Sequence, residues 1–233
     1  MSARKSTLFA IAAAVLLLAG CGRSDAEQRQ AFIAFMQTRV LDKPGIHVPR
    51  LTDEERESLG DYADDFAIIT DFNKMMDESI SSKLSSAMNA GSISSVEDVV
   101  NHRPQIRAAA ATLATLNSAL DTNLAKANEA RAKLDQPEDV KAVFDQTYDR
   151  LVTKPAGAFK EVVPVATNVL DQVLDLANYL DAHRSAVTFS GSLMNVTDPA
   201  VRSAIQGKLE ALQGSQQALQ SAQSKLQSVI NGS

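Results

Sequence analysis

The chain has 233 residues, a formal net charge of −5 and a single cysteine. An acidic chain lacks the basic surface that a phosphate backbone requires, so we expect no nucleic-acid partner. One cysteine excludes a disulfide framework. Aromatic residues make up 5% of the chain and tryptophan is absent, a composition that favours helices over sheets.

The N-terminus has the layout of a secretory signal peptide. A basic pair at residues 4–5 precedes an apolar run at residues 8–18, which is too short to span a bilayer as a helix. The sequence LAGC at residues 18–21 closes this run and resembles the lipobox of bacterial lipoproteins. The resemblance implies cleavage between Gly20 and Cys21, followed by lipidation of Cys21.

On this interpretation the chain has three parts. Residues 1–20 are a signal peptide that is removed, residues 21–23 are a lipidated anchor with a very short tether, and residues 24–233 form a periplasmic domain. The thiol of Cys21 carries a diacylglyceryl group, and its new amine carries an acyl chain such as palmitate. Each buried methylene contributes about 0.8 kcal/mol, so three chains would hold the protein on a membrane. A free cysteine beside the apolar run is the alternative.

The residue after the predicted anchor bears on localisation. It is Gly22 rather than aspartate, which by resemblance to enterobacterial sorting favours the outer membrane, with the domain facing the periplasm. The periplasmic face of the inner membrane and the cell surface are the alternatives.

Helix signals follow in chain order. Capping boxes at residues 24–27 and 52–55 each predict a helix start. The first helix should stop before Pro44, and the second should run without interruption to about Ala90. A turn is expected at residues 96–100, before a helix that starts near Pro104.

Three prolines are expected to interrupt the helices in the second half of the chain. Pro137 should restart the chain as a helix, and residues 153–155 should form a further break and restart. Pro164 predicts a kink or a helix boundary near Val162. The alternating and β-branched residues at 187–196 predict the one candidate β-hairpin.

The last predicted helix begins at Asp198-Pro199 and carries leucine every seven residues, at 212, 219 and 226. Such heptads are typical of a coiled-coil seam, although glutamines at 216 and 223 weaken it. We favour packing of this helix on its own domain, with formation of a homo-oligomer through it as the alternative. The predicted fold is therefore all-α: an elongated bundle of long amphipathic helices with one short hairpin near 187–196.

Four segments carry a family resemblance. The sequences at residues 28–40, 48–52, 140–159 and 162–166, of which "VFDQTYDRLVTKPA" is the strongest block, resemble the YiaF-like lipoproteins of Gram-negative bacteria. That family is defined by a domain of unknown function. The resemblance implies a lipobox and a helical periplasmic domain, and it brings no catalytic residues.

No catalytic or metal-binding pattern is found in the sequence. His47, His102 and His183 are scattered and lack metal-ligand spacing, and no nucleophile elbow is present. We expect surface or helix-capping roles for the histidines, and no cofactor or metal. The acid pairs at 64–65 and 77–78 should form a solvated face, because adjacent helical residues point in different directions.

The sequence therefore favours a non-enzymatic envelope lipoprotein that is held on the membrane through Cys21 and contacts an envelope protein. The first alternative is a periplasmic binding module for a lipid or another apolar ligand. The residues that could enclose its pocket are Phe66, Phe72, Met75, Met76, Phe144, Phe159 and Phe189. A periplasmic enzyme, built from residues distant in sequence, is the third and least favoured alternative.

Overall fold

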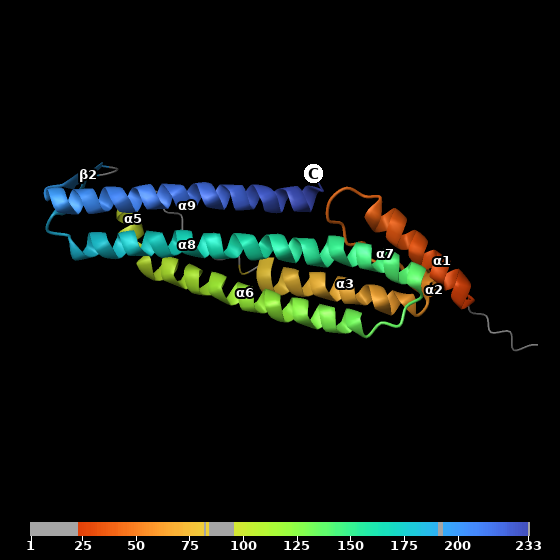
Figure 1. Ribbon diagram of the computed structural model, residues 1–233. Helices are drawn as coiled ribbons and strands as arrows, with labels where there is room; N and C mark the ends of the chain where they lie inside the picture. The colour runs from red at the N-terminus through yellow and green to blue at the C-terminus, as the bar shows by residue number, and fades with distance from the viewer. Residues whose placement is uncertain (1–22, 82, 84–95, 191–192, 233) are drawn as a thin grey trace, which may run out of the picture.

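A computed structural model describes residues 23–81, 83, 96–190 and 193–232. Over these residues the chain is an elongated bundle of α-helices with a β-hairpin at one end (Figure 1), which confirms the predicted fold class. The elements are α1 (Asp25–Met36), η1 (Gln37–Leu41), α2 (Asp53–Leu59), α3 (Tyr62–Met76), η2 (Asp77–Ser81), α5 (Val96–Asn101), α6 (Arg103–Ala132), α7 (Glu138–Tyr148), η3 (Asp149–Thr153), α8 (Lys154–Ala182), β1 (Val187–Ser190), β2 (Leu193–Val196) and α9 (Pro199–Asn231), where η denotes a π-helical turn.

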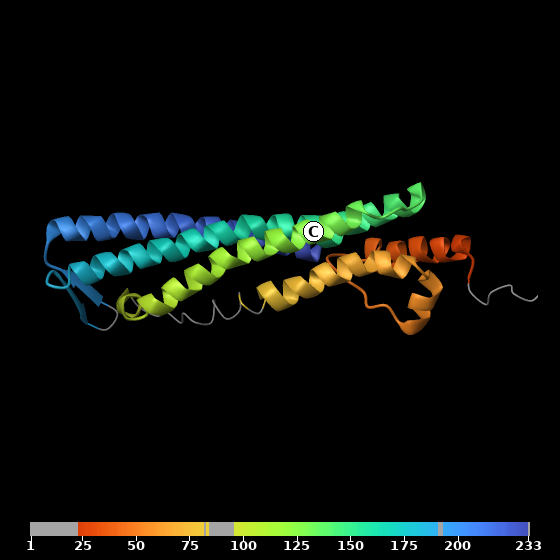
Figure 2. The ribbon, with the colours of Figure 1, turned by 90° about the horizontal axis from the view of Figure 1, so that it is seen from below.

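Three long helices, α6, α8 and α9, run along the molecule side by side (Figures 1 and 2). Helix α8 lies between the other two and packs against both. On α6, Ala109 and Ala110 are buried, as expected where small side chains allow two helices to approach closely. Among the described residues, no helix combines the length and the apolar character needed to cross a membrane.

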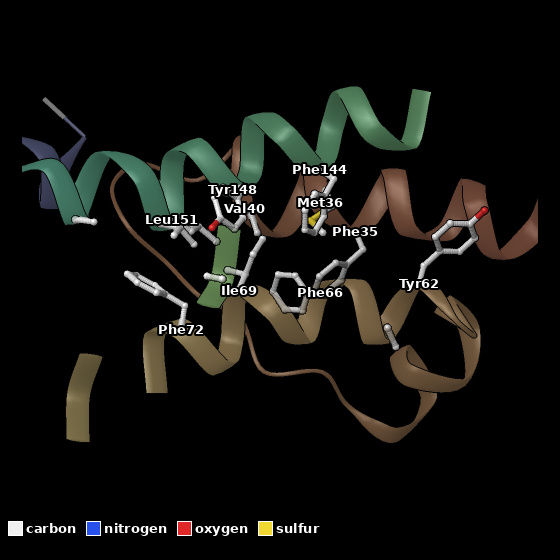
Figure 3. Close-up of a cluster of buried hydrophobic side chains, with 14 of the residues drawn as sticks. Phe35, Met36, Val40, Tyr62, Phe66, Ile69, Phe72, Phe144, Tyr148 and Leu151 are labelled. Carbon is white, nitrogen blue, oxygen red and sulfur yellow. The ribbon is translucent and has the colours of Figure 1, made fainter. Parts of the chain in front are cut away.

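The main hydrophobic core lies where α1, α3, α6, α7 and η3 meet (Figure 3). The ring of Phe32 stacks on Tyr62 and on Phe144, with centroid distances of 5.4 and 6.5 Å. The ring of Phe35 meets Phe66 edge-on at 5.1 Å. Such pairs add about 0.5–1.5 kcal/mol beyond the area they bury, so the aromatic residues of three helices stabilise this end of the bundle.

Both predicted capping boxes are present. The backbone N–H of Ser24 donates to Glu27 at 2.8 Å, and the backbone N–H of Glu55 donates to the Thr52 hydroxyl at 3.1 Å. Each box satisfies backbone donors at a helix start that have no partner within the helix. These local signals correctly located the starts of α1 and α2.

The prediction of one uninterrupted helix from residue 53 to about Ala90 is wrong. Helix α2 ends at Leu59, and α3 begins after Gly60, whose φ of +55° lies in the left-handed region. A Cβ at this position would collide with the side chain of Gln28 from α1. Glycine thus breaks the helix where α1 passes close by. The expected end near Ala90 lies outside the described residues.

The predicted break at residues 153–155 is also wrong. The chain is helical from Glu138 to Ala182, and the π-helical turn η3 joins α7 to α8 without a loop. The ring of Pro155 would clash with the carbonyl group of Leu151 in a regular α-helix. The wider π turn relieves this clash. Helix α8 also continues through Pro164, so no helix boundary occurs near Val162.

The far end of the molecule contains the hairpin and a short helix. Strands β1 and β2 pair antiparallel, with Val187 opposite Val196, which confirms the predicted hairpin. The turn predicted at residues 96–100 is instead the short helix α5. Helix α9 begins as predicted at the N-cap Asp198, whose Oδ1 accepts from the N–H of Ala200 at 2.7 Å.

Helix α9 packs on its own domain, as favoured from the sequence, and its partner is α8. Polar contacts accompany this packing: Ser215 accepts hydrogen bonds from Asn168 and Gln172, and Lys225 forms an ion pair with Glu161 at 2.5 Å. The heptad leucines Leu212, Leu219 and Leu226 are only half-buried. The seam therefore retains accessible apolar surface.

Candidate functional site

The predicted lipidation, cleavage and sorting residues, Cys21, Gly20 and Gly22, precede the first described residue, Arg23. Their roles therefore stay predictions. The described chain begins at one end of the elongated body, at the start of α1 (Figure 1). A lipid on Cys21 would consequently lie at this end, which we call the anchored end.

Helix α1 is fixed to the body at the anchored end. The guanidinium group of Arg29 forms an ion pair with the carboxylate of Asp139 at the start of α7. Its Nε donates to the two carboxylate oxygens at 2.8 and 2.9 Å. The hydroxyl of Tyr62 donates to Asp25 at 3.2 Å. The hydrogen bond from Arg29 lowers the pKa of Asp139, so this carboxylate is charged at neutral pH. The start of α1 is thus tied to both α3 and α7.

The opposite end, which we call the distal end, holds the β-hairpin. Val187 and Val196 pack against Leu176, Leu180, Val201 and Ile205 in a cluster separate from the main core. The helical stretch from α7 to α8 contains 11, 5 and 29 residues in its three parts. At a rise of 1.5 Å per residue it separates the two ends by about 65 Å. Leu193 in β2 is 73% exposed.

The C-terminal half of α9 carries a shallow groove of about 630 Å³. The described residues that line it are uncharged, although the chain as a whole is acidic. Ile230, one of its lining residues, is 45% exposed. The groove includes Gln223 and Leu226, which the heptad pattern singled out as seam residues. The described residues that line it are Gln220, Gln223, Ser224, Leu226, Gln227 and Ile230.

The end of α9 is held in place by the loop that follows η1. The backbone N–H of Ile46 donates to the carbonyl oxygen of Ile230 at 2.8 Å. Arg150 in η3 donates to the carbonyl oxygens of Leu41 at 2.7 Å and of Gly45 at 3.1 Å. Sequence analysis missed this role of Arg150, because no local pattern marks an arginine that binds distant backbone carbonyls.

The capping roles predicted for the histidines agree with their geometry. Nδ1 of His102 lies 2.8 Å from the carbonyl oxygen of Asp98, and Nδ1 of His183 lies 2.8 Å from that of Tyr179. His183 also stacks on the Tyr179 ring at 4.1 Å. His47 is exposed. Within the described part of the chain, no three His, Cys, Asp or Glu side chains are placed to hold a metal ion.

Contrary to the prediction from the sequence, Asp65 does not lie on a solvated face. Asp64 is exposed, but Asp65 is half-buried and accepts a hydrogen bond from Gln136 at 2.6 Å. Burial, together with the charges of Asp64 and Asp61, raises the pKa of Asp65. A signal was available in the sequence, because residue 65 lies between the buried positions 62 and 66 on the apolar side of α3.

The aromatic residues proposed to enclose an apolar pocket form packed core and line neither of the cavities found among the described residues. Phe66, Phe72 and Phe144 are fully buried in the main core (Figure 3). Phe159 packs at the edge of that core, whereas Phe189 belongs to the cluster at the distal end. These side chains pack against other core residues, and none of them lines the α9 groove.

Comparison with known proteins identifies a family to which the chain is similar. A family model described as "Protein of unknown function (DUF3053)" matches residues 8–227. The chain is 29% identical over 188 residues to the uncharacterized protein YiaF of Escherichia coli K12, and the alignment covers 79% of each chain. YiaF of Shigella flexneri matches with the same values. No solved structure matches.

Proposed function

This chain belongs to the DUF3053 family, the YiaF-like proteins of unknown function, and from this premise we propose that it is a membrane-anchored envelope lipoprotein that acts by contact with another envelope protein. In this proposal a signal peptidase cleaves after Gly20, lipid is attached to Cys21, and Gly22 permits sorting to the outer membrane. The domain faces the periplasm, and the protein works without a catalytic step.

The single observation that carries the proposal is the position of α1 relative to the rest of the body. The chain enters at one end, and α1 is bound there to α3 and α7 through Tyr62 and Asp139. Only residues 21–23 separate the predicted lipid from this fixed helix. A body about 65 Å long would therefore have little freedom to move relative to the membrane. Its helical faces would be presented to a partner close to the membrane surface.

The groove on α9 is the contact surface that we propose. It combines amide side chains, which donate and accept hydrogen bonds, with the apolar side chains of Leu226 and Ile230. An uncharged groove along a helix fits the apolar face of an amphipathic helix from the partner. Because none of the described lining residues is charged, contact with them avoids the desolvation of unpaired ions.

In-cell crosslinking tests this proposal. A photo-reactive amino acid replaces Gln220 or Gln227 in the groove, and a matched variant carries it at the exposed Arg50, which does not line the groove. We expect a discrete adduct with one envelope protein from the groove positions alone. The same adduct should be lost when Cys21→Ser releases the protein from the membrane.

Two outcomes would contradict the proposal. An adduct with the mass of two copies of this chain would show that the groove joins identical subunits instead. An undiminished adduct in the Cys21→Ser protein would show that the anchor does not contribute to contact.

A further inference from the structure

Helix α5 meets the start of α6 at the distal end (Figures 1 and 2). Residues from both helices line a cavity of about 450 Å³ there. It lies apart from the α9 groove, and its lining has a different chemistry. Three of its six described lining residues are arginines, and none is acidic. The lining residues are Val100, Asn101, Arg103, Pro104, Arg107 and Arg184.

Two of the arginines, Arg103 and Arg184, come from separate parts of the chain and are held by one carboxylate. Asp181 near the end of α8 accepts from Arg103 at 2.6 Å through one oxygen and pairs with Arg184 at 2.5 Å through the other. Nε of Arg103 also donates to the carbonyl oxygen of Val100 at 3.1 Å. Two guanidinium groups are therefore positioned before any ligand arrives.

Arg107 differs from the other two arginines. It is exposed one turn along α6, and within the described ranges the structure gives it neither a hydrogen bond nor an ion pair. All of its N–H groups remain available to a ligand in the cavity.

The cavity concentrates positive charge in an acidic chain. Hydrogen bonds from Arg103 lower the pKa of Asp181, so its carboxylate offsets one of the three guanidinium charges at neutral pH. Two formal positive charges remain, whereas the whole chain carries −5. A local field of sign opposite to that of the molecule attracts anions to this one place.

We propose that this cavity binds the phosphate group of a small phosphate monoester or of free phosphate. A phosphate monoester carries about −1.5 to −2 charges at pH 7 and three acceptor oxygens, which matches the two remaining positive charges. Guanidinium groups present paired N–H donors that suit phosphate oxygens. A carboxylate carries one charge and two oxygens, so it fits this site less well. The proposal is independent of the contact function assigned to the α9 groove.

Titration calorimetry on the full chain in detergent micelles tests the site. The probes are inorganic phosphate, glycerol 3-phosphate and acetate, at pH 7 and low ionic strength, because salt screens such contacts. We expect saturable binding of one phosphate per chain, and Arg107→Gln should weaken it at least tenfold. Since Arg107 is exposed and has no polar partner among the described residues, this variant should keep the thermal stability of the wild type.

The matched control is Arg50→Gln, which removes an exposed arginine far from the cavity in sequence and should leave affinity unchanged. Tighter binding of glycerol 3-phosphate than of phosphate would identify an esterified ligand, and the reverse would identify the free ion; both support the proposal. It is overturned if no saturable binding occurs, if acetate binds as tightly as phosphate, or if Arg107→Gln and Arg50→Gln behave alike.

Discussion

Arg150 binds Gly45 from a position more than a hundred residues along the chain, with its Nε 3.1 Å from the glycine carbonyl oxygen. The same guanidinium group also donates to the carbonyl oxygens of Leu41 and Lys43. Ile46, which follows Gly45, donates its backbone N–H to the carbonyl oxygen of Ile230 at the end of α9. The end of η1, the π turn within the long helix and the end of α9 are therefore joined at one place.

Arg150→Lys should destabilise the fold. Lysine presents a single ammonium group and cannot reproduce the planar fork that reaches three carbonyl groups. Hydrogen bonds to charged groups contribute about 1.5–3 kcal/mol each. Lysine and water replace some of these bonds, so we expect the free energy of unfolding to fall by about 1–3 kcal/mol. Urea unfolding measures this loss. Arg50→Lys, at an exposed arginine, is the matched control, and equal midpoints for the two variants would contradict the role given to Arg150.

Gly45→Ala tests the same junction from the other side. The φ of +71° at Gly45 is unfavourable for any residue with a side chain, and an added Cβ would lie 2.5 Å from the carbonyl oxygen of Ile230. We expect a loss of about 1–3 kcal/mol in unfolding free energy.

The control for this substitution is Gly157→Ala in α8, where nothing lies within 4 Å of an added Cβ. Removing a glycine from a helix interior should raise stability by about 0.5–1 kcal/mol. Opposite signs for the two alanine variants in urea unfolding are the expected result. A stabilising Gly45→Ala would show that α9 does not dock closely on this loop.

The features that sequence reasoning found are those with local causes. The capping serine and glutamate at 24 and 27 lie within one turn, and Asp198 is followed directly by Pro199, so their neighbours determine the structure. The hairpin at 187–196 likewise carries its own alternation pattern. The lipobox pattern at residues 18–21 is also local, and its role stays a prediction.

The features that sequence reasoning missed have causes in distant parts of the chain. Gly60 ends α2 with a left-handed φ of +55°, at a place where Gln28 of another helix lies against it. The arginine cavity brings Arg107 and Arg184 together only after α6 and α8 pack. No window of sequence contains these pairs, so periodicity and propensity could not predict them.

Asp65→Asn should raise the thermal stability at pH 7. Burial raises the pKa of Asp65 in the folded state, so the folded protein holds this proton more tightly than the unfolded chain does. At pH 7 the carboxylate is charged in both states and its partial burial destabilises the fold; this penalty is relieved as the pH falls through the raised pKa. Asparagine removes the charge and can still accept from Gln136.

Thermal melts of Asp65→Asn and wild type from pH 4 to pH 8 measure this effect. The stabilisation should be largest at neutral pH and should shrink towards pH 4. Asp64→Asn, at an exposed neighbour, is the control and should change the melting temperature less. A destabilised Asp65→Asn protein at pH 7 would contradict the electrostatic account.

The ion pair at the anchored end should have the opposite dependence on pH. The hydrogen bond from Arg29 lowers the pKa of Asp139 below that of the unfolded chain. The stability that this ion pair contributes is therefore fully present above the pKa of an aspartate in the unfolded chain, about 3.9. It is lost as the pH falls through the lower pKa of Asp139 in the folded state.

Asp139→Asn should accordingly lower the melting temperature at pH 7 and have little effect near pH 3. Hydrogen exchange should also become faster in α1, because α1 loses its tie to α7. The exposed pair of Lys133 and Glu129 supplies the control variant Glu129→Gln, which should leave exchange in α1 unchanged. Unaltered exchange in the Asp139→Asn protein would contradict the claim that this pair holds α1.

The central claim is that a lipid on Cys21 holds this helical body on a membrane. Intact-mass spectrometry of the protein extracted from bacterial membranes tests it most directly, with Cys21→Ser as the comparison. The proposal predicts a chain that starts at Cys21 and carries the added mass of one diacylglyceryl group and one further acyl chain, and it predicts no such species for Cys21→Ser. A chain with an unmodified cysteine, or one that retains residues 1–20, would contradict it.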